Sequence, residues 1–183
     1  MKAKTMIQYF FIFLIPLLLL FARFCLVKFL IVSGNSMLPG LKKGNVILVS
    51  ILEQENDCLF KNRVLPENSL KLSNQDLVVF RAPDNDLAVK RIIGVPGDSY
   101  SFTDSSVQIN GIYLNEPYAV NQGNYISALK RFASFPFIPL EVQGRIPPRY
   151  FLLLGDNRNN STDSRDFGLV PASSITGKVI LKF

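Results

Sequence analysis

The chain contains no histidine among its 183 residues. This absence excludes the usual serine–histidine pairing for nucleophilic catalysis, and it removes the commonest metal ligand in proteins. A general base, if there is one, must be another residue type. Cysteine is scarce as well: Cys25 lies in the apolar N-terminal part and Cys58 in a polar stretch, so we expect no disulfide between them.

The chain has only a modest excess of positive charge. Lysine and arginine outnumber aspartate and glutamate by 20 to 14, which gives a formal net charge of +6. The basic residues are scattered and form no stripe with interleaved aromatic side chains, as a nucleic-acid-binding surface would need. We therefore expect no nucleic acid partner.

Apolar residues are abundant at the N-terminus. Lys2 and Lys4 precede the apolar run Ile7–Ala22. About 20 apolar residues suffice to cross a bilayer. We predict one transmembrane helix over roughly Met6–Val27, within an N-terminal segment of residues 1–30 that also holds the N-terminus itself.

A cleaved signal peptide is the alternative for this run. Such peptides end in a small-x-small site, whereas this run exits through Ala22-Arg23-Phe24-Cys25-Leu26, which favours the anchor. Basic residues flank the run on both sides, so charge alone leaves the orientation in the membrane open. They are Lys2 and Lys4 before it, and Arg23, Lys28, Lys42 and Lys43 after it.

Residues 31–183 have the pattern of a mostly β domain. Short apolar runs rich in valine and isoleucine, bounded by turn residues, predict strands in antiparallel sheets. Asn110-Gly111, between two of them, is typical of a type I′ hairpin turn. No segment after residue 32 has a sustained helical period. The predicted strands are Val46–Ser50, Leu77–Phe80, Leu87–Ile93, Val107–Ile109, Ile112–Leu114, Tyr150–Leu154 and Gly177–Phe183.

Two stretches of this domain are less regular. Residues 53–75 are polar and typical of a loop. Residues 118–149 carry Phe132 and several further apolar residues among prolines, which makes them a candidate flap. Within them, Phe135–Pro139 can pack in the core or lie against a bilayer, and we favour core packing.

Ser36 is the candidate nucleophile. It lies in Val32–Leu41, where the apolar run ends, beside Gly34, which lets another backbone approach closely. A serine hydroxyl is a poor nucleophile unless a neighbouring base accepts its proton. Taken alone, a serine beside Gly34 and Asn35 is usually a turn residue.

Lys90 is the candidate base. With no histidine, lysine is the practical alternative, but at its ordinary pKa of ~10.4 only about one lysine in 2,500 is neutral at pH 7. Burial lowers a lysine pKa, and Lys90 lies in the apolar run Leu87–Ile93, followed by the rigid turn Gly94–Asp98. An isolated lysine would otherwise be read as an exposed strand residue.

The segment 155–168 is too polar for a core strand. An EF-hand would need acidic groups at alternate positions and a final glutamate, and that pattern is absent. Arg158 and Arg165 would also oppose a bound cation, so a network of Asp–Arg pairs is favoured. We expect no metal and no other cofactor.

Together these segments resemble the type I signal peptidases, membrane-anchored serine proteases of the Ser-Lys type. The resemblance covers nearly the whole chain and rests on these motifs: S-G-N-S-M-L-P at 33–39, D-L-V-V-F-R-A-P at 76–83, V-K-R-I-I-G-V-P-G-D at 89–98, and G-D-N-R-N-N-S-T-D-S-R-D-F-G at 155–168. The last two are specific in combination.

The resemblance implies a role for each matching residue. Ser36 would be the nucleophile, Lys90 the general base, and Ser161 the residue that orients the lysine. The pairs that hold the site together would be Asp163 with Arg165, and Arg91 with Asp156.

Three features depart from the common pattern. Many members carry a serine at the position of Gly34, whose hydroxyl helps to form the oxyanion hole, so here the hole would rest on backbone N–H groups, chiefly that of Ser36. Gly40 replaces a common threonine, and Asn74-Gln75-Asp76 replaces a common R-G-D.

The implied protein is a signal-peptidase-like, membrane-bound serine endopeptidase that removes N-terminal signal peptides from exported preproteins. Its substrates would carry small residues one and three positions before the scissile bond. The resemblance places it in the cytoplasmic (inner) membrane as a single-pass protein, N-terminus inside and catalytic domain outside, in contact with the bilayer. We expect a monomer.

Two alternatives stay open. One is a specialised relative that processes a conjugation, pilin or organellar precursor. The other is a non-catalytic, membrane-tethered β-domain that binds peptides.

Overall fold

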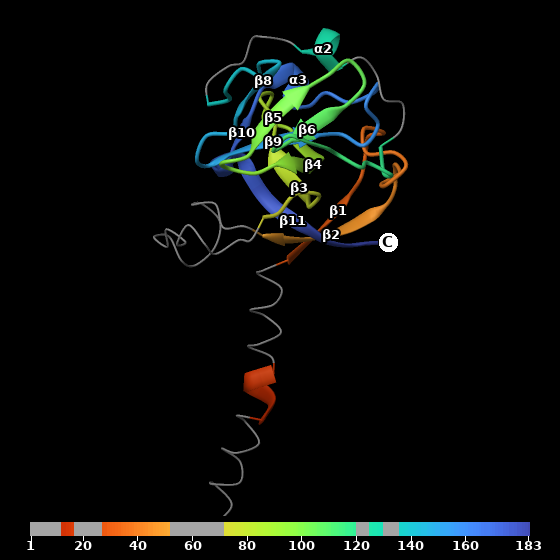
Figure 1. Cartoon of the computed structure of the whole chain (residues 1–183). Coiled ribbons are helices and arrows are strands. Elements are labelled where there is room, and N and C mark those ends of the chain that lie inside the picture. The colour runs from red at the N-terminus through yellow and green to blue at the C-terminus, as the bar shows by residue number, and fades with distance from the viewer. Residues whose placement is uncertain (1–11, 17–26, 52–71, 120–124, 130–135) are drawn as a thin grey trace, which may run out of the picture.

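Two antiparallel sheets build the β domain of the computed structural model (Figure 1), which describes residues 12–16, 27–51, 72–119, 125–129 and 136–183. The prediction of a mostly β, antiparallel fold is confirmed. The seven-stranded sheet has the order β1 (Val27–Ile31), β2 (Val46–Ile51), β11 (Ile175–Lys182), β3 (Leu77–Arg81), β4 (Leu87–Gly94), β9 (Tyr150–Leu154) and β10 (Val170–Pro171). The four-stranded sheet has the order β7 (Ile112–Tyr113), β6 (Val107–Ile109), β5 (Ser99–Phe102) and β8 (Gln143–Arg145).

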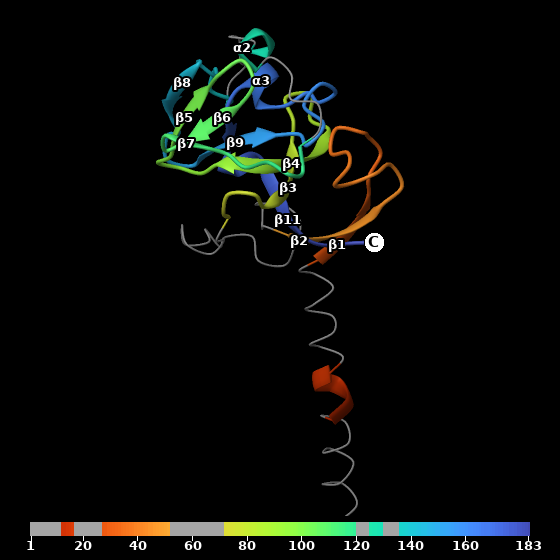
Figure 2. The same cartoon turned by 45° about the vertical axis from the view of Figure 1, so that its right-hand side comes forward.

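The two sheets pack against each other, because residues of β4 and β9 share a core cluster with residues of β5 and β6. Strands β1 and β2 and the C-terminus lie at one end, and the four-stranded sheet lies at the other, in both views (Figures 1 and 2). Among the described residues after residue 26, the helical segments are single turns: α2 (Tyr125–Ala128), α3 (Ser164–Phe167) and the 3-10 turn Ala172–Ser174. Their shortness agrees with the absence of a helical period in the sequence.

Every strand that the sequence predicts is present, with shifts of one or two residues at some ends. The Asn110-Gly111 turn is confirmed too, because both residues have positive φ, 53° and 77°. The strands that the sequence did not predict are β1, β5, β8 and β10. Strand β8, Gln143–Arg145, is exposed throughout and β10 has two residues, so neither offers an alternating apolar pattern.

The N-terminal part of the domain differs from the expected boundary. Strand β1 begins at Val27 and pairs antiparallel with β2 from Val27 opposite Ser50 to Ile31 opposite Val46. Strand β1 therefore crosses the boundary expected between the N-terminal segment 1–30 and the β domain 31–183. The reason is that pairing with β2 satisfies the backbone N–H and C=O groups of residues 27–31.

The expected membrane span lies largely outside the described residues, which include only 12–16 of its apolar core, in helical conformation. Within the described ranges, we find no helix with the length and apolar character needed to cross a membrane. Cys25 and Cys58 and the polar stretch at 53–71 also lie outside the described residues.

The described residues of the irregular segment 118–149 make contacts with the rest of the domain. Its strand β8 pairs with β5, and Ile138 forms an isolated bridge with Leu169. Phe137 is buried in a core cluster with Phe151 and Phe167. The favoured core packing is therefore found for Phe137, whereas Phe132 and Phe135 are not among the described residues.

Strand register brings the functional segments together. Lys90 on β4 lies opposite Val78 of β3, and the next residue, Arg91, lies opposite Leu154 of β9. Because Leu154 ends β9, the segment 155–168 starts beside the strand that carries Lys90. Side chains alternate along a strand, so those of Lys90 and Arg91 point to opposite faces of β4. Residues 155–168 can therefore be contacted by side chains on both faces of this strand.

The hairpin turn gives a test of the fold. Gly111 has φ of +77°, a conformation in which a Cβ atom is unfavourable. Gly111→Ala should therefore lower the free energy of unfolding of the full-length chain by about 1–2 kcal/mol, measured by denaturant titration. Gly34→Ala is the matched control, because a Cβ there would meet no atom within 4 Å and no left-handed φ is involved. Equal stabilities of the two variants would contradict the assignment of the turn.

Candidate active site

Ser36 is held by buried neighbours in a tight turn. Met37 and Leu41 are buried in one core cluster with Val32, and the N–H of Leu41 donates to the carbonyl of Met37 at 2.7 Å. Burial of these flanking side chains fixes the turn and leaves Ser36 itself half-buried at its surface. The apolar residues of Val32–Leu41 thus position the serine.

Lys90 reaches Ser36 directly. The distance from Lys90 Nζ to Ser36 Oγ is 2.8 Å, a hydrogen bond between residues 54 apart in sequence. Lys90 is only 4% exposed, on a strand whose next inward residue, Ile92, is fully buried. An amine so placed has lost most of its hydration.

Burial lowers the pKa of Lys90 below its ordinary value. The carboxylates of Asp163, Asp156 and Asp166 act in the opposite direction, whereas Arg165 also lowers it. Desolvation is the largest of these effects, so the neutral amine is favoured compared with an exposed lysine. A neutral amine can accept the proton of a hydroxyl within hydrogen-bond distance.

Two hollows meet at this pair. The first is lined by residues 34–36, by residues of the β3–β4 turn, and by Asn160–Thr162 with Phe167. The second is mostly apolar and is lined by residues of β1, β2 and β4, including Leu30, Ile47 and Val89. An extended peptide lying across Ser36 would thus find space on both sides of the hydroxyl.

The segment 155–168, which we call the polar loop, is bonded to the turn that carries Ser36. The backbone N–H of Asn157 donates to the carbonyl of Ser36 at 2.9 Å, and its side-chain amide donates to the carbonyl of Asn35 at 3.2 Å. The polar loop therefore fixes the backbone of the serine as well as lining the hollow.

Asp163 and Arg165 form a bidentate ion pair, 2.9 Å from Arg165 Nη2 to Asp163 Oδ2. Asp163 is completely buried, caps α3, and accepts a hydrogen bond from the N–H of Gly155 at 3.0 Å. One carboxylate thus joins the two ends of the polar loop. Asp166 completes the capping box by accepting from the N–H of Asp163.

Arg91 and Asp156 form a second bidentate ion pair, with distances of 2.8 and 2.7 Å. Asp156 is completely buried. A Cβ atom at Gly40 would lie 2.7 Å from Asp156 Oδ2, so the glycine that departs from the common pattern lets the turn approach this carboxylate closely. With these aspartates bonded to arginines, the polar loop has the Asp–Arg network rather than an open ring of oxygens.

Ser161 is near the pair but not bonded to it. Its side chain lines the first hollow together with Lys90, yet its buried Oγ is the one side-chain polar atom without a hydrogen-bond partner among the described buried residues. The expected hydrogen bond to the lysine is therefore not formed in this structure. Gly155 packs directly behind it, where a Cβ atom would lie 2.1 Å from Ser161 Oγ.

Gly34 borders open space. A Cβ atom there would meet no atom within 4 Å, so the chain has room for a side chain at this position. It contributes no side-chain donor beside Ser36. Donors for a developing negative charge would have to come from the backbone.

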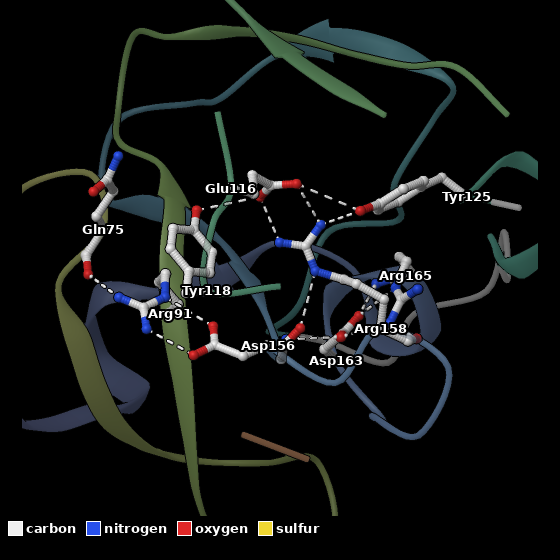
Figure 3. A network of polar contacts seen from close by, with 10 residues as sticks. Gln75, Arg91, Glu116, Tyr118, Tyr125, Asp156, Arg158, Asp163 and Arg165 are labelled. Carbon is white, nitrogen blue, oxygen red and sulfur yellow. Dashed lines mark hydrogen bonds and ion pairs between the residues drawn. The ribbon is translucent and has the colours of Figure 1, made fainter. Parts of the chain in front are cut away.

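Three polar residues near the site carry no role in the sequence analysis, Glu116, Tyr118 and Tyr125, and Arg158 is expected there in the Asp–Arg network without an assigned partner. They form a buried network behind the polar loop, linked to the Arg91–Asp156 and Asp163–Arg165 pairs (Figure 3). The two ion pairs implied by the resemblance include no carboxylate partner for Arg158. This missing partner is the signal in the sequence that a further carboxylate belongs to the network. No spacing rule points to Glu116, because it lies 42 residues away.

Comparison with known proteins gives concordant matches. Residues 4–183 match the family described as signal peptidase, peptidase S26. Signal peptidase IB of Staphylococcus aureus (strain Mu50) is 36% identical over 157 residues, covering 83% of this chain and 75% of that protein. Signal peptidase I of Bacillus caldolyticus is 31% identical over 153 residues, covering 84% and 77% respectively.

A crystal structure of a signal peptidase I from Enterococcus faecalis V583 has 29% sequence identity and a TM-score of 0.44, over 61% of this chain and 98% of that one. The family match spans almost the whole sequence, and the sequence identities to the staphylococcal and bacillar enzymes extend over most of it. The chain therefore belongs to the signal peptidase family, peptidase S26, and is a serine peptidase.

Proposed function

We propose that this chain removes N-terminal signal peptides from exported preproteins, with Ser36 as nucleophile and Lys90 as general base. The observation that carries the proposal is the 2.8 Å contact between Lys90 Nζ and Ser36 Oγ, made by a lysine that is 4% exposed. Membership of the family supports signal peptide removal. A peptide-binding domain without activity would not need a desolvated amine against a hydroxyl.

In the first half of the reaction, Ser36 Oγ attacks the carbonyl carbon of the scissile bond while its proton passes to Lys90 Nζ. The tetrahedral intermediate then collapses. Lys90 gives the proton to the leaving nitrogen as the C–N bond breaks, and the signal peptide is left as an ester on Ser36. The amine is neutral again and ready for the second half.

In the second half, water attacks the ester carbonyl and Lys90 takes the proton of the water. When the ester C–O bond breaks, the proton returns to Ser36 Oγ, and the signal peptide leaves with a free carboxyl group, whose remaining proton passes to solvent. Atoms and protons therefore balance with one serine and one lysine, and the cycle needs no metal or cofactor.

The negative charge on the substrate oxygen in each tetrahedral state needs donors. We assign the backbone N–H of Ser36 as the chief donor, because Gly34 offers no hydroxyl. Substrate would lie extended across the two hollows, with small side chains one and three residues before the scissile bond. The N-terminal apolar run would anchor the chain in the cytoplasmic membrane, N-terminus inside and β domain outside.

Replacement of either member of the pair tests the assignment. Ser36→Ala removes the attacking oxygen, and Lys90→Met keeps an apolar side chain of similar length without an amine. Each should lower kcat for cleavage of a preprotein peptide after Ala-x-Ala by at least ~10²–10⁴-fold, measured as product release. Lys178→Met, on a partly exposed lysine of β11, is the control and should keep wild-type turnover. Wild-type turnover in both site variants would contradict the pair.

The pH dependence tests the protonation state. Only neutral Lys90 can accept the proton, so kcat/KM should rise as the pH increases through the pKa of Lys90 in the free enzyme and then level off. Because burial lowers the pKa of Lys90, the plateau should be reached well below ~10.4. A pH–rate profile on a peptide with no group that titrates in this range provides the measurement. A rate that rises only near the ordinary lysine pKa would contradict a desolvated base.

Gly34→Ser tests the oxyanion assignment. The new side chain meets no steric obstacle, and its hydroxyl would add a donor beside Ser36. We expect kcat to rise by up to ~10²-fold with KM little changed, because such a donor acts on charge that exists only in the tetrahedral state. Gly34→Ala adds the carbon without the donor and should leave kcat unchanged. Equal kcat in the two variants would mean that the hole lies elsewhere.

A further inference from the structure

Glu116 is an acidic residue in an unusual place. It lies in the connection between β7 and α2, in Asn115-Glu-Pro-Tyr118, and is only 7% exposed. Carboxylates are almost never buried unless a partner compensates their charge. Its position therefore requires a specific contact.

The partner is Arg158 of the polar loop. Arg158 Nη1 lies 2.8 Å from Glu116 Oε2, and Arg158 Nη2 lies 2.5 Å from Oε1, a bidentate arrangement in which both side chains are almost fully buried. Burial alone would lower the pKa of Arg158, but the hydrogen bonds and charge of Glu116 outweigh it and raise the pKa. Glu116 therefore stabilises the charged form of Arg158 in this buried place.

Two tyrosines close this contact. The hydroxyl of Tyr118 donates to Glu116 Oε1 at 3.2 Å, and burial, reinforced by the charge of Glu116, raises the pKa of Tyr118 so that the hydroxyl stays protonated. Arg158 Nη1 also donates to the hydroxyl of Tyr125, which is fully buried. The carboxylate and guanidinium are thus surrounded by hydrogen bonds (Figure 3).

Arg158 transmits this contact to the site. Its Nε donates to the carbonyl of Gly155 at 3.0 Å, and its own carbonyl accepts from Arg165 Nη2 at 2.7 Å. The residue before it, Asn157, donates its N–H to the carbonyl of Ser36. One buried guanidinium therefore fixes the stretch of backbone that touches the serine.

The same short segment reaches the other ion pair of the site. The guanidinium of Arg91 lies 4.0 Å from the centre of the Tyr118 ring while it binds Asp156. Glu116 thus contacts Arg158, and Tyr118 contacts Arg91, the arginine that binds Asp156. Figure 3 shows these residues as one connected group.

We propose that Glu116 is a positioning residue for the peptidase reaction, acting through Arg158 to hold the polar loop against Ser36 and Lys90. The inference rests on the proposed function of this site. Without the carboxylate, Arg158 would remain as an uncompensated buried charge, which is strongly unfavourable. The guanidinium would then move toward water or toward Asp163 and take residues 155–158 with it.

Glu116→Gln in the full-length chain tests the inference, since it keeps the shape of the side chain and removes the charge. We expect kcat for a signal-peptide substrate to fall at least tenfold with KM changed less than threefold. The acidic limb of the pH–rate profile should also move to higher pH. The charged groups that act on Lys90, namely Asp156, Asp163, Arg165 and Asp166, all lie on the polar loop. Displacement of this loop would reduce the desolvation of the amine, which is the largest effect on its pKa.

Two further variants separate positioning from stability. Val107→Ala removes buried apolar contacts from β6, a strand that carries no residue of the polar network, and should lower the melting temperature while leaving kcat and the pH limb unchanged. Arg158→Lys keeps the charge but loses the bidentate fork, and should reproduce the kinetic effect in a milder form. If Glu116→Gln fails to fold, Arg158→Lys provides the test of the positioning role in its place.

Hydrogen exchange of the backbone amides at 155–168 gives a readout that is independent of activity. Protection should fall there in Glu116→Gln and Arg158→Lys, and not in Val107→Ala. If wild type cleaves the substrate and the folded variants keep its kcat, its pH limb and its protection, the positioning role is overturned. If wild type itself cleaves no signal peptide, the proposed function fails, and the exchange experiment still decides whether Glu116 holds the loop.

Discussion

The hydrogen bond between a desolvated lysine amine and a serine hydroxyl is the contact on which the site depends. Lys90 is charged in water at neutral pH, so the domain must remove its hydration while leaving the amine within reach of Ser36. Strand β4 does the first by placing Lys90 between buried residues of the seven-stranded sheet. The turn at Val32–Leu41 keeps the amine within reach, because its residues Met37 and Leu41 are buried while Ser36 is only half-buried.

Charge compensation is the second requirement. Three arginines lie within the site region, and each is paired with one buried or largely buried carboxylate: Arg91 with Asp156, Arg158 with Glu116, and Arg165 with Asp163. Buried ion pairs are weak evidence for stability, since an apolar replacement often stabilises as much. Buried ion pairs do fix the relative positions of the segments that they join. Here they hold the polar loop against both faces of β4 without adding a free charge beside Lys90.

Much of this arrangement can be predicted from the sequence, for reasons that differ among residues. Short apolar runs bounded by turn residues predict β4 and β9, and the Asn110-Gly111 dipeptide predicts its turn, because these signals are local. The absence of histidine directs attention to Lys90, and family resemblance supplies the Asp–Arg pairs. The edge strand β8 and the Glu116–Arg158 pair are not predictable in this way. An exposed strand has no apolar pattern, and a contact across 42 residues depends on the tertiary fold.

In the proposed reaction, Ser36 forms a covalent ester with the signal peptide because neutral Lys90 takes its proton. Acid quenching during turnover of a preprotein peptide, followed by intact-mass measurement and peptide mapping, detects this ester. We expect a mass increase equal to the N-terminal fragment, located on Ser36 in the wild type and absent in Lys90→Met. An adduct on another residue, or equal amounts of ester on Ser36 in both proteins, would contradict it.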